Sequence, residues 1–259
     1  MSLMGSLSFG VFGFGGFRKK NAAGVSWSPA PNITKTTDGT YTVLTANGTC
    51  TVTVVNGPIE NVDIMLVGRG GNSGPHNYGG GGGGLVYATT KSLSNGSKPL
   101  SIGSNVTFDG WTALQGGPTG STGSHDPNGH ITAGRPGGSG GGTGRSGGTI
   151  GPNSFGGTAT QPTQSQPAPS SQYGNPGFGK GGNPCKGGGG AGSGGPNTYP
   201  DVNGGNGYPI SISGSPITYA AGSPSPSRFP GPGSSNPNTP GRGGGGGIPG
   251  TVIIRYPTP

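Results

Sequence analysis

The sequence predicts a protein that is mainly β and irregular, with essentially no α-helix: a small β-sheet module that brackets a packed bundle of polyglycine II helices. First, 65 of the 259 residues are glycine and 27 are proline, and both residues weaken or break helices. Second, the longest stretch without either residue is the eleven residues from Leu85 to Asn95, which leaves no room for helices of ordinary length. Third, clear strand patterns stand at both ends of the glycine-rich centre. Helix bundles, Rossmann folds and TIM barrels are thereby excluded.

Residues 1–32 are expected to form an attachment segment. They contain a short apolar run with four phenylalanines, Phe9, Phe12, Phe14 and Phe17, followed by Arg18-Lys19-Lys20. A signal peptide has its positive charges before the apolar run, and this run is too short and too rich in glycine to span a membrane. We interpret the phenylalanines as an exposed aromatic contact with a partner; a disordered terminus is the alternative.

Residues 33–67 are predicted to be β-strands. Ile33–Thr37 and Thr40–Thr45 flank Asp38-Gly39, a dipeptide typical of tight hairpin turns. In Thr49–Val55 the threonines alternate with Cys50, Val52 and Val54, which is the pattern of a half-buried strand. Cys50 is then a small core residue, and with Cys185 it could form at most one disulfide, which the sequence leaves open. Val62–Val67 is apolar enough to be a more continuously buried strand.

Further strands are expected within and after the glycine-rich region. Short strands are predicted around Leu85–Ala88 and Leu100–Ile102, and a hairpin at Pro209–Ser213 and Pro216–Ala220, where Gly214-Ser215 suits a type II′ turn. Residues 251–256 form a closing strand beside Val62–Val67, and residues 257–259 a tail. The domain predicted over 33–256 therefore consists of strands 33–67 and 251–256 closing polyglycine blocks over 68–250.

The glycine runs between these strands have two physical interpretations. The main runs lie at 79–84, 137–142, 187–195 and 243–247, with spacers rich in proline, serine and asparagine. As linkers they would be flexible coils. Alternatively, they form helices of three residues per turn, which can approach closely because they lack Cβ atoms and can bond backbone to backbone. Several runs recur within one chain between strands that must pair, which favours ordered packing.

The order of motifs resembles the glycine-rich domain of bacteriophage structural proteins. The resemblance lies in Tyr41-Thr-Val-Leu-Thr, Cys50-Thr-Val-Thr-Val and Val62-Asp-Ile-Met-Leu-Val-Gly, followed by glycine blocks and Gly250-Thr-Val-Ile-Ile-Arg-Tyr256. It covers roughly residues 33–256 and implies a virion protein at the tail or fibre tip. The related adhesins of some T-even-like phages stack polyglycine II helices whose distal loops contact the host.

Function, on this interpretation, lies in the loops between the glycine runs, because polyglycine carries no side chains. The loops contain aromatic and basic side chains that suit contact with a bacterial surface glycan or outer-membrane protein; the candidates are His76, Tyr78, Trp111, His125, His130, Tyr173, Phe178, Tyr199, Arg228 and Phe229. The alternative for each is an aromatic residue that packs against the side of the glycine stack. Other virion proteins would bind residues 1–32, and either a trimer or a single copy would suit a three-fold fibre.

Other functions are expected to be absent. The six acidic residues are scattered, with no pair placed for glycoside hydrolysis, so we expect neither an enzyme nor a cofactor. His125, Asp126 and His130 suggest a metal cluster only weakly, and we expect no metal. The pI is near 9.7, but Arg69, Arg145 and Arg242 are too far apart for a typical RGG module, so nucleic-acid binding is not expected. A non-adhesive structural virion component, such as a decoration or fibre-assembly protein, is the main alternative, and a disordered RGG-like protein a third.

Overall fold

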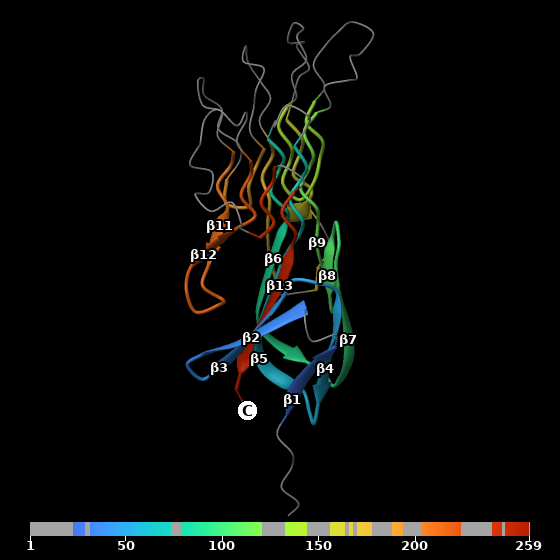
Figure 1. Ribbon diagram of the computed structural model, residues 1–259, viewed down its shortest axis with the longest axis vertical. Coiled ribbons are helices and arrows are strands. Elements are labelled where there is room, and N and C mark those ends of the chain that lie inside the picture. The colour runs from blue at the N-terminus through green and yellow to red at the C-terminus, as the bar shows by residue number, and fades with distance from the viewer. Residues whose placement is uncertain are drawn as a thin grey trace, which may run out of the picture.

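The computed structural model describes residues 23–28, 32–73, 79–120, 133–143, 156–163, 166–167, 170–177, 188–193, 204–223, 240–244 and 247–258. Two β-sheets occupy one end of an elongated molecule, and glycine-rich segments continue from them along its long axis (Figure 1). The described part contains no α-helix, as the sequence predicts, and is mainly β.

The two main sheets are antiparallel. The five-stranded sheet has the order β1-β4-β7-β8-β9, with the bounds Gly24–Ser28 (β1), Cys50–Val55 (β4), Gly96–Ile102 (β7), Val106–Phe108 (β8) and Trp111–Ala113 (β9). The six-stranded sheet has the order β10-β6-β5-β13-β3-β2, with the bounds Ser171–Tyr173 (β10), Leu85–Leu93 (β6), Ile59–Val67 (β5), Thr251–Pro257 (β13), Tyr41–Ala46 (β3) and Ile33–Asp38 (β2). A separate hairpin pairs β11 (Tyr208–Ile210) with β12 (Ile217–Tyr219), and a 3-10 turn, η2, covers Gln161–Thr163.

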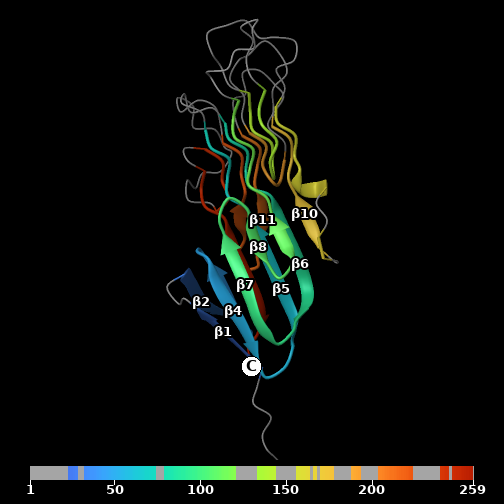
Figure 2. The ribbon, with the colours of Figure 1, turned by 90° about the vertical axis from the view of Figure 1, so that its right-hand side faces the viewer.

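Apolar side chains fill the space between the two sheets. Phe108 of β8 and Leu100 of β7 meet Ile64 of β5 and Val86 of β6 in one buried cluster. A second cluster lies on the outer face of the six-stranded sheet, where Met65 and Ile253 pack against the β11–β12 hairpin through Ile210 and Tyr219. The six-stranded sheet is therefore the middle layer, covered on one face by the other sheet and on part of the other face by the hairpin (Figure 2).

Several sequence predictions are confirmed. Val62–Val67 lies within β5 and pairs with β13, with Thr251 opposite Val67. Cys50, Val52 and Val54 face the core while Thr51 and Thr53 are half-exposed. The Cys50 thiol is buried and free, and burial raises its pKa.

One prediction about the strands is corrected, and the structure contains three further strands that the sequence analysis does not predict. The β module begins at Gly24 rather than at residue 33, because Val25 and Trp27 of β1 pack against the core and β1 pairs with β4. The short strands β8 and β9 were missed, although the Asp109-Gly110 turn between them has positive φ at both residues (47° and 88°), as Asp-Gly hairpin turns do. Strand β10, at Ser171–Tyr173, was also missed.

The hairpin near residue 214 exists, but its turn is not the predicted one. Tyr208 pairs with Tyr219 and Ile210 with Ile217, so six residues connect the strands rather than two. A two-residue turn at Gly214-Ser215 would require the Pro216 amide to donate the closing hydrogen bond, and proline has no N–H. The Gly214 amide instead donates to the Ser211 carbonyl (3.0 Å).

We call the two main sheets together the sandwich. The glycine-rich segments leave the same end of the sandwich and run side by side along the long axis (Figures 1 and 2). Gly68 follows β5 directly, Gly84 precedes β6 and Gly250 precedes β13. We call the following segments together the glycine bundle: 68–73, 79–84, 114–120, 133–143, 156–160, 174–177, 188–193, 204–207, 220–223, 240–244 and 247–250.

Hydrogen bonds between these segments repeat every three residues. In the central segment 79–84, the amides of Gly81 and Gly84 donate to the carbonyls of Gly117 and Leu114, 2.9 and 2.8 Å away, on the same neighbouring segment. The two amides between them donate to different segments, Gly82 to Gly189 and Gly83 to Gly241. This is the period of a helix with three residues per turn, so the glycine runs form a packed bundle with the polyglycine II pattern.

The carbonyls of the central segment have the same period and reach three further neighbours. Those of Gly79 and Gly82 accept from Gly142 and Ser139, at 2.8 and 3.0 Å. Those of Gly81 and Gly84 accept from Gly71 and Gly68, at 2.7 and 2.8 Å, and that of Gly80 accepts from Ser223 at 2.9 Å. Segment 79–84 is thus bonded to six other described segments through backbone groups.

Lys91 is a buried lysine between the two sheets whose ammonium group lacks a described hydrogen-bond partner. Lys91 on β6 is 7% exposed, its Nζ has no hydrogen-bond partner among the described residues, and it lies 6.0 Å from the centre of the Trp111 ring. Burial disfavours the charged amine and lowers the Lys91 pKa.

We expect Lys91→Met to raise the free energy of unfolding by about 1 kcal/mol at neutral pH, because it removes an unpaired buried charge and keeps the side-chain length. The folded pKa is below the unfolded value, so the charge destabilises the fold below the folded pKa and this penalty fades as pH rises toward the unfolded pKa. The advantage of Lys91→Met should therefore shrink at alkaline pH, which urea unfolding at pH 7 and pH 10 would measure. An advantage that grows with pH would contradict this account.

Candidate functional site

The distal end of the glycine bundle is the end farthest from the two sheets. Hydrogen bonds show that Gly79, Gly120 and Gly142 lie next to one another at this end. The Gly142 amide donates to the Gly79 carbonyl (2.8 Å), and the Gly120 amide donates to the Gly142 carbonyl (3.2 Å). Segments 68–73, 114–120 and 138–143 run from the sheets toward this end, whereas 79–84 runs back from it. Four stretches of the sequence join described segments at this end: 74–78, 121–132, 144–155 and 178–187.

Most predicted contact residues lie outside the described residues. His76 and Tyr78 belong to 74–78, His125 and His130 to 121–132, and Phe178 to 178–187. Each of these stretches starts and finishes beside a described residue near the distal end. Three further candidates also lie outside the described residues: Tyr199, Arg228 and Phe229. The same is true of Phe9, Phe12, Phe14 and Phe17 in the predicted attachment segment.

Trp111 is a core residue, which corrects its prediction as a contact residue. It lies on β9, is 5% exposed and belongs to the cluster between the sheets. Its indole Nε1 donates to the Pro167 carbonyl (3.2 Å). The apolar ring is therefore buried and its N–H has a hydrogen-bond partner within the protein.

Tyr173 is also part of the β region rather than of a displayed loop. It lies on β10, and its ring stacks on Tyr208 of β11 with centroids 4.0 Å apart. This contact joins the edge of the six-stranded sheet to the β11–β12 hairpin. Trp111 and Tyr173 thus pack within the β region, which is neither a displayed loop nor the side of the glycine stack.

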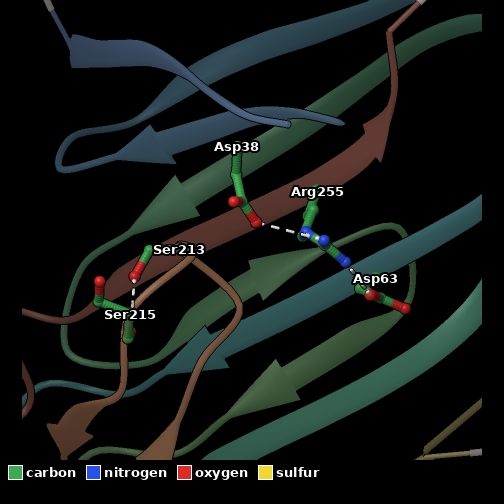
Figure 3. A network of polar contacts seen from close by, with 5 residues as sticks. All are labelled: Asp38, Asp63, Ser213, Ser215 and Arg255. Atoms are coloured by element: carbon green, nitrogen blue, oxygen red, sulfur yellow. Dashed lines mark hydrogen bonds and ion pairs between the residues drawn. The ribbon is translucent and has the colours of Figure 1, made fainter. Parts of the chain in front are cut away.

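A charged cluster on the outer face of the six-stranded sheet was not predicted. The Arg255 guanidinium lies 3.3 Å from the Asp38 carboxylate and 3.5 Å from that of Asp63 (Figure 3). Its Cζ is 3.7 Å from the centre of the Tyr41 ring. Burial, and then the Asp63 charge, raise the pKa of the neighbouring Tyr87. The sequence held one signal for this cluster. Side chains two residues apart on a strand point to the same face, so Arg255 lies on the same face of β13 as Ile253.

The Arg255 cluster is structural rather than chemical. Both carboxylates are engaged by one guanidinium, so neither is placed as a general acid or base. The hairpin loop lies close by: a Cβ on Gly214 would lie 3.0 Å from the Asp38 carboxyl carbon, and the Ser213 hydroxyl donates to the Ser215 carbonyl (3.4 Å; Figure 3). Arg255 thus ties β13 to β2 and β5 underneath the loop.

Two other features are absent from the described residues. They contain no group of three or more histidine, cysteine, aspartate or glutamate residues arranged to hold a metal ion. They also contain no helix with the length and hydropathy needed to cross a membrane.

The chain matches no protein-family model and no curated protein.

Proposed function

We propose that this protein is a bacteriophage virion adhesin, located at the tail or fibre tip, that presents loops on a polyglycine II scaffold for contact with the host surface. Its partners would be other virion proteins at the N-terminal segment and a bacterial surface glycan or outer-membrane protein at the loops.

The observation that carries the proposal is that the two ends of the described chain lie at the opposite end of the molecule from the distal end of the glycine bundle. Strand β1 starts at Gly24, which is paired with Val55, and the described chain leaves β13 at Thr258, whose amide donates to Thr40 (2.8 Å). Both points lie at the end of the sandwich away from the glycine bundle (Figure 1). A protein held at that end would direct the distal end of its bundle outward.

The construction of the bundle supports a presenting role. Its segments are fixed by backbone hydrogen bonds to several neighbours, so the flanks of each connecting stretch are held in place whatever side chains the stretch carries. Stretches 74–78, 121–132 and 178–187 carry candidate contact residues.

Replacement of residues 121–132 by twelve glycine and serine residues in the virion tests the proposal. We expect particles to assemble in normal yield and host adsorption to fall at least about tenfold, a loss of roughly 1.4 kcal/mol in binding. The matched control replaces exposed Thr34, Lys35 and Thr36 of β2 by serine, which should leave adsorption unchanged. Failed assembly would support the structural virion component instead. Normal adsorption after each of the four distal stretches is replaced in turn would refute the adhesin.

A further inference from the structure

Charge is distributed unevenly along the molecule. The described residues of the two sheets and their turns carry four acidic and four basic side chains: Asp38, Glu60, Asp63, Asp109, Lys35, Lys91, Lys98 and Arg255. Three of the four acids are in ion pairs, since Asp109 lies 2.8 Å from the Lys98 Nζ and Arg255 engages Asp38 and Asp63. The sandwich therefore has no net formal charge.

The glycine-rich part, by contrast, is basic. The charged residues among its described segments are three arginines, Arg69, Arg135 and Arg242, with no acid. The sequence between those segments adds Arg145, Lys180, Lys186 and Arg228 against only Asp126 and Asp201. Five of the eight net positive charges of the chain thus belong to the glycine-rich part, and the other three are Arg18, Lys19 and Lys20.

Arg135 is the most accessible of the three described arginines. It is exposed, whereas Arg69 and Arg242 are half-buried. Its amide donates to the Pro118 carbonyl (3.1 Å) on the neighbouring segment 114–120, and its carbonyl accepts from the Gly141 amide (3.0 Å) farther along its own segment. These two bonds fix the Arg135 backbone. Its guanidinium has no ion-pair partner among the described residues. A fixed arginine without a carboxylate is available to phosphate or carboxylate groups, which match its planar donors.

We infer that the glycine bundle binds an anionic glycan, one that carries phosphate or carboxylate groups, and that Arg135 contacts it directly. The inference rests on the proposed adhesin function and names its class of receptor. Exposed neutral polar residues of the bundle, Asn72, Thr158 and Asn206, offer donors and acceptors that suit sugar hydroxyls.

A glycan fits these surfaces better than a nucleic acid does. Sequence-tolerant binding of single strands depends on aromatic side chains that stack on the bases, and the described segments of the bundle contain no aromatic residue. Groove reading in duplex DNA uses an α-helix or a β-ribbon, and the described bundle has neither. The bundle offers positive charge together with exposed neutral hydrogen-bonding groups.

The test measures binding of the full chain to three immobilised probes: polygalacturonate, uncharged dextran and a 30-nucleotide single-stranded DNA. We expect binding to polygalacturonate that weakens as salt rises from about 50 to 200 mM, since charge-driven binding is screened, and no comparable binding to dextran. Arg135→Glu should weaken binding to polygalacturonate about tenfold, because it replaces an attraction by a repulsion. Arg135→Lys should retain most of the affinity. The matched control, Lys35→Glu on β2, makes the same charge change on an exposed residue of the sandwich and should have little effect.

Three results would overturn the inference: equal binding to dextran, equal losses for Arg135→Glu and Lys35→Glu, or tighter binding to the DNA than to polygalacturonate. The last would assign a nucleic-acid partner instead.

Adsorption of virions that carry Arg135→Glu separates this inference from the proposed function. If replacement of the distal stretches abolishes adsorption and Arg135→Glu does not alter it, the protein is an adhesin for an uncharged receptor. If neither change alters adsorption, the proposed function fails as well.

Discussion

Gly82→Ala is expected to destabilise the protein by about 3 kcal/mol or more, although it adds only one methyl group. Gly82 is buried in the central segment of the bundle, and a Cβ there would overlap the Ala220 carbonyl oxygen and lie 2.7 Å from its carbon. The obstacle is backbone, which cannot rotate away as a side chain can, so adjacent segments must separate and their shared hydrogen bonds must lengthen. Overpacking of a tight interior typically costs 1–3 kcal/mol, and the loss of backbone hydrogen bonds adds to this.

Gly103→Ala is the matched control for this substitution. Gly103 lies in the turn between β7 and β8, where the nearest atom to an added Cβ would be the Asn105 carbonyl oxygen at 3.7 Å, an ordinary contact. Thermal unfolding should show a large drop in Tm for Gly82→Ala and almost none for Gly103→Ala. Equal stability of the two variants would mean that the bundle is far looser than its hydrogen bonds indicate.

Gln161→Leu should have the second largest effect, a loss of about 2–4 kcal/mol in the free energy of unfolding. The Gln161 side chain is fully buried, and its Oε1 accepts from the Leu114 amide at 2.7 Å. Its Nε2 donates to the Thr112 carbonyl (3.1 Å) and to the Gln172 side chain (3.0 Å). Leucine fills a similar volume but removes all three hydrogen bonds. The Leu114 amide loses this acceptor, and the Thr112 carbonyl keeps its bond from Gln166. An unsatisfied group costs about 1–3 kcal/mol, and each further lost hydrogen bond adds about 1 kcal/mol.

Gln161 also closes an open edge of the sandwich. It bonds the free edge of β9 and reaches Gln172 of β10, so it joins the edge strands of the two sheets. Gln166 bonds the same edge through the Thr112 amide (2.9 Å) and carbonyl (2.7 Å), but it is only half-buried. Gln166→Leu should therefore cost about 1 kcal/mol in urea unfolding. A smaller loss for Gln161→Leu than for Gln166→Leu would contradict the role given to burial.

The fold class was predictable because the two controlling patterns are local. Alternation identified the strand from Cys50 to Val55, and the apolar run Val62–Val67 identified the partner of β13. The absence of helix follows from the spacing of glycine and proline alone. The three-residue period of the bundle follows from glycine itself, since only residues without Cβ can pack this closely.

The errors came from interactions that the sequence does not reveal locally. Strand β1 lies just before Pro29 and Pro31, and it is a strand because Val25 and Trp27 reach the core and pair with β4. Trp111 was taken for a loop residue because it sits among glycine and polar residues, yet β9 places it between the sheets. The Arg255 cluster joins residues that are more than 190 positions apart in the sequence, so only the register of β13 with β3 and β5 brings them together.

The candidate site was predictable only in part. That function would lie in the stretches between glycine runs remains a prediction, whereas the structure adds which of these stretches begin and end near the distal end. The basic character of the glycine-rich part could have been found from the sequence by assigning charges separately to the strands and to this part. The exposure of Arg135, on which its inferred role rests, could not.

The three-residue period of the bundle has a consequence for how the chain folds. If one glycine segment slides by three residues, about 9 Å, its amides face the same type of carbonyl as before, and polyglycine alone hardly distinguishes the two alignments. The same indifference extends to chain direction, because segment 114–120 bonds 68–73 in parallel and 79–84 in antiparallel orientation. Correct phasing must come from the strands, whose side chains fit in one register only. The sandwich thus acts as a template that selects one of several nearly equivalent alignments, and a chain whose sheets form late would accumulate slipped, compact but misaligned bundles.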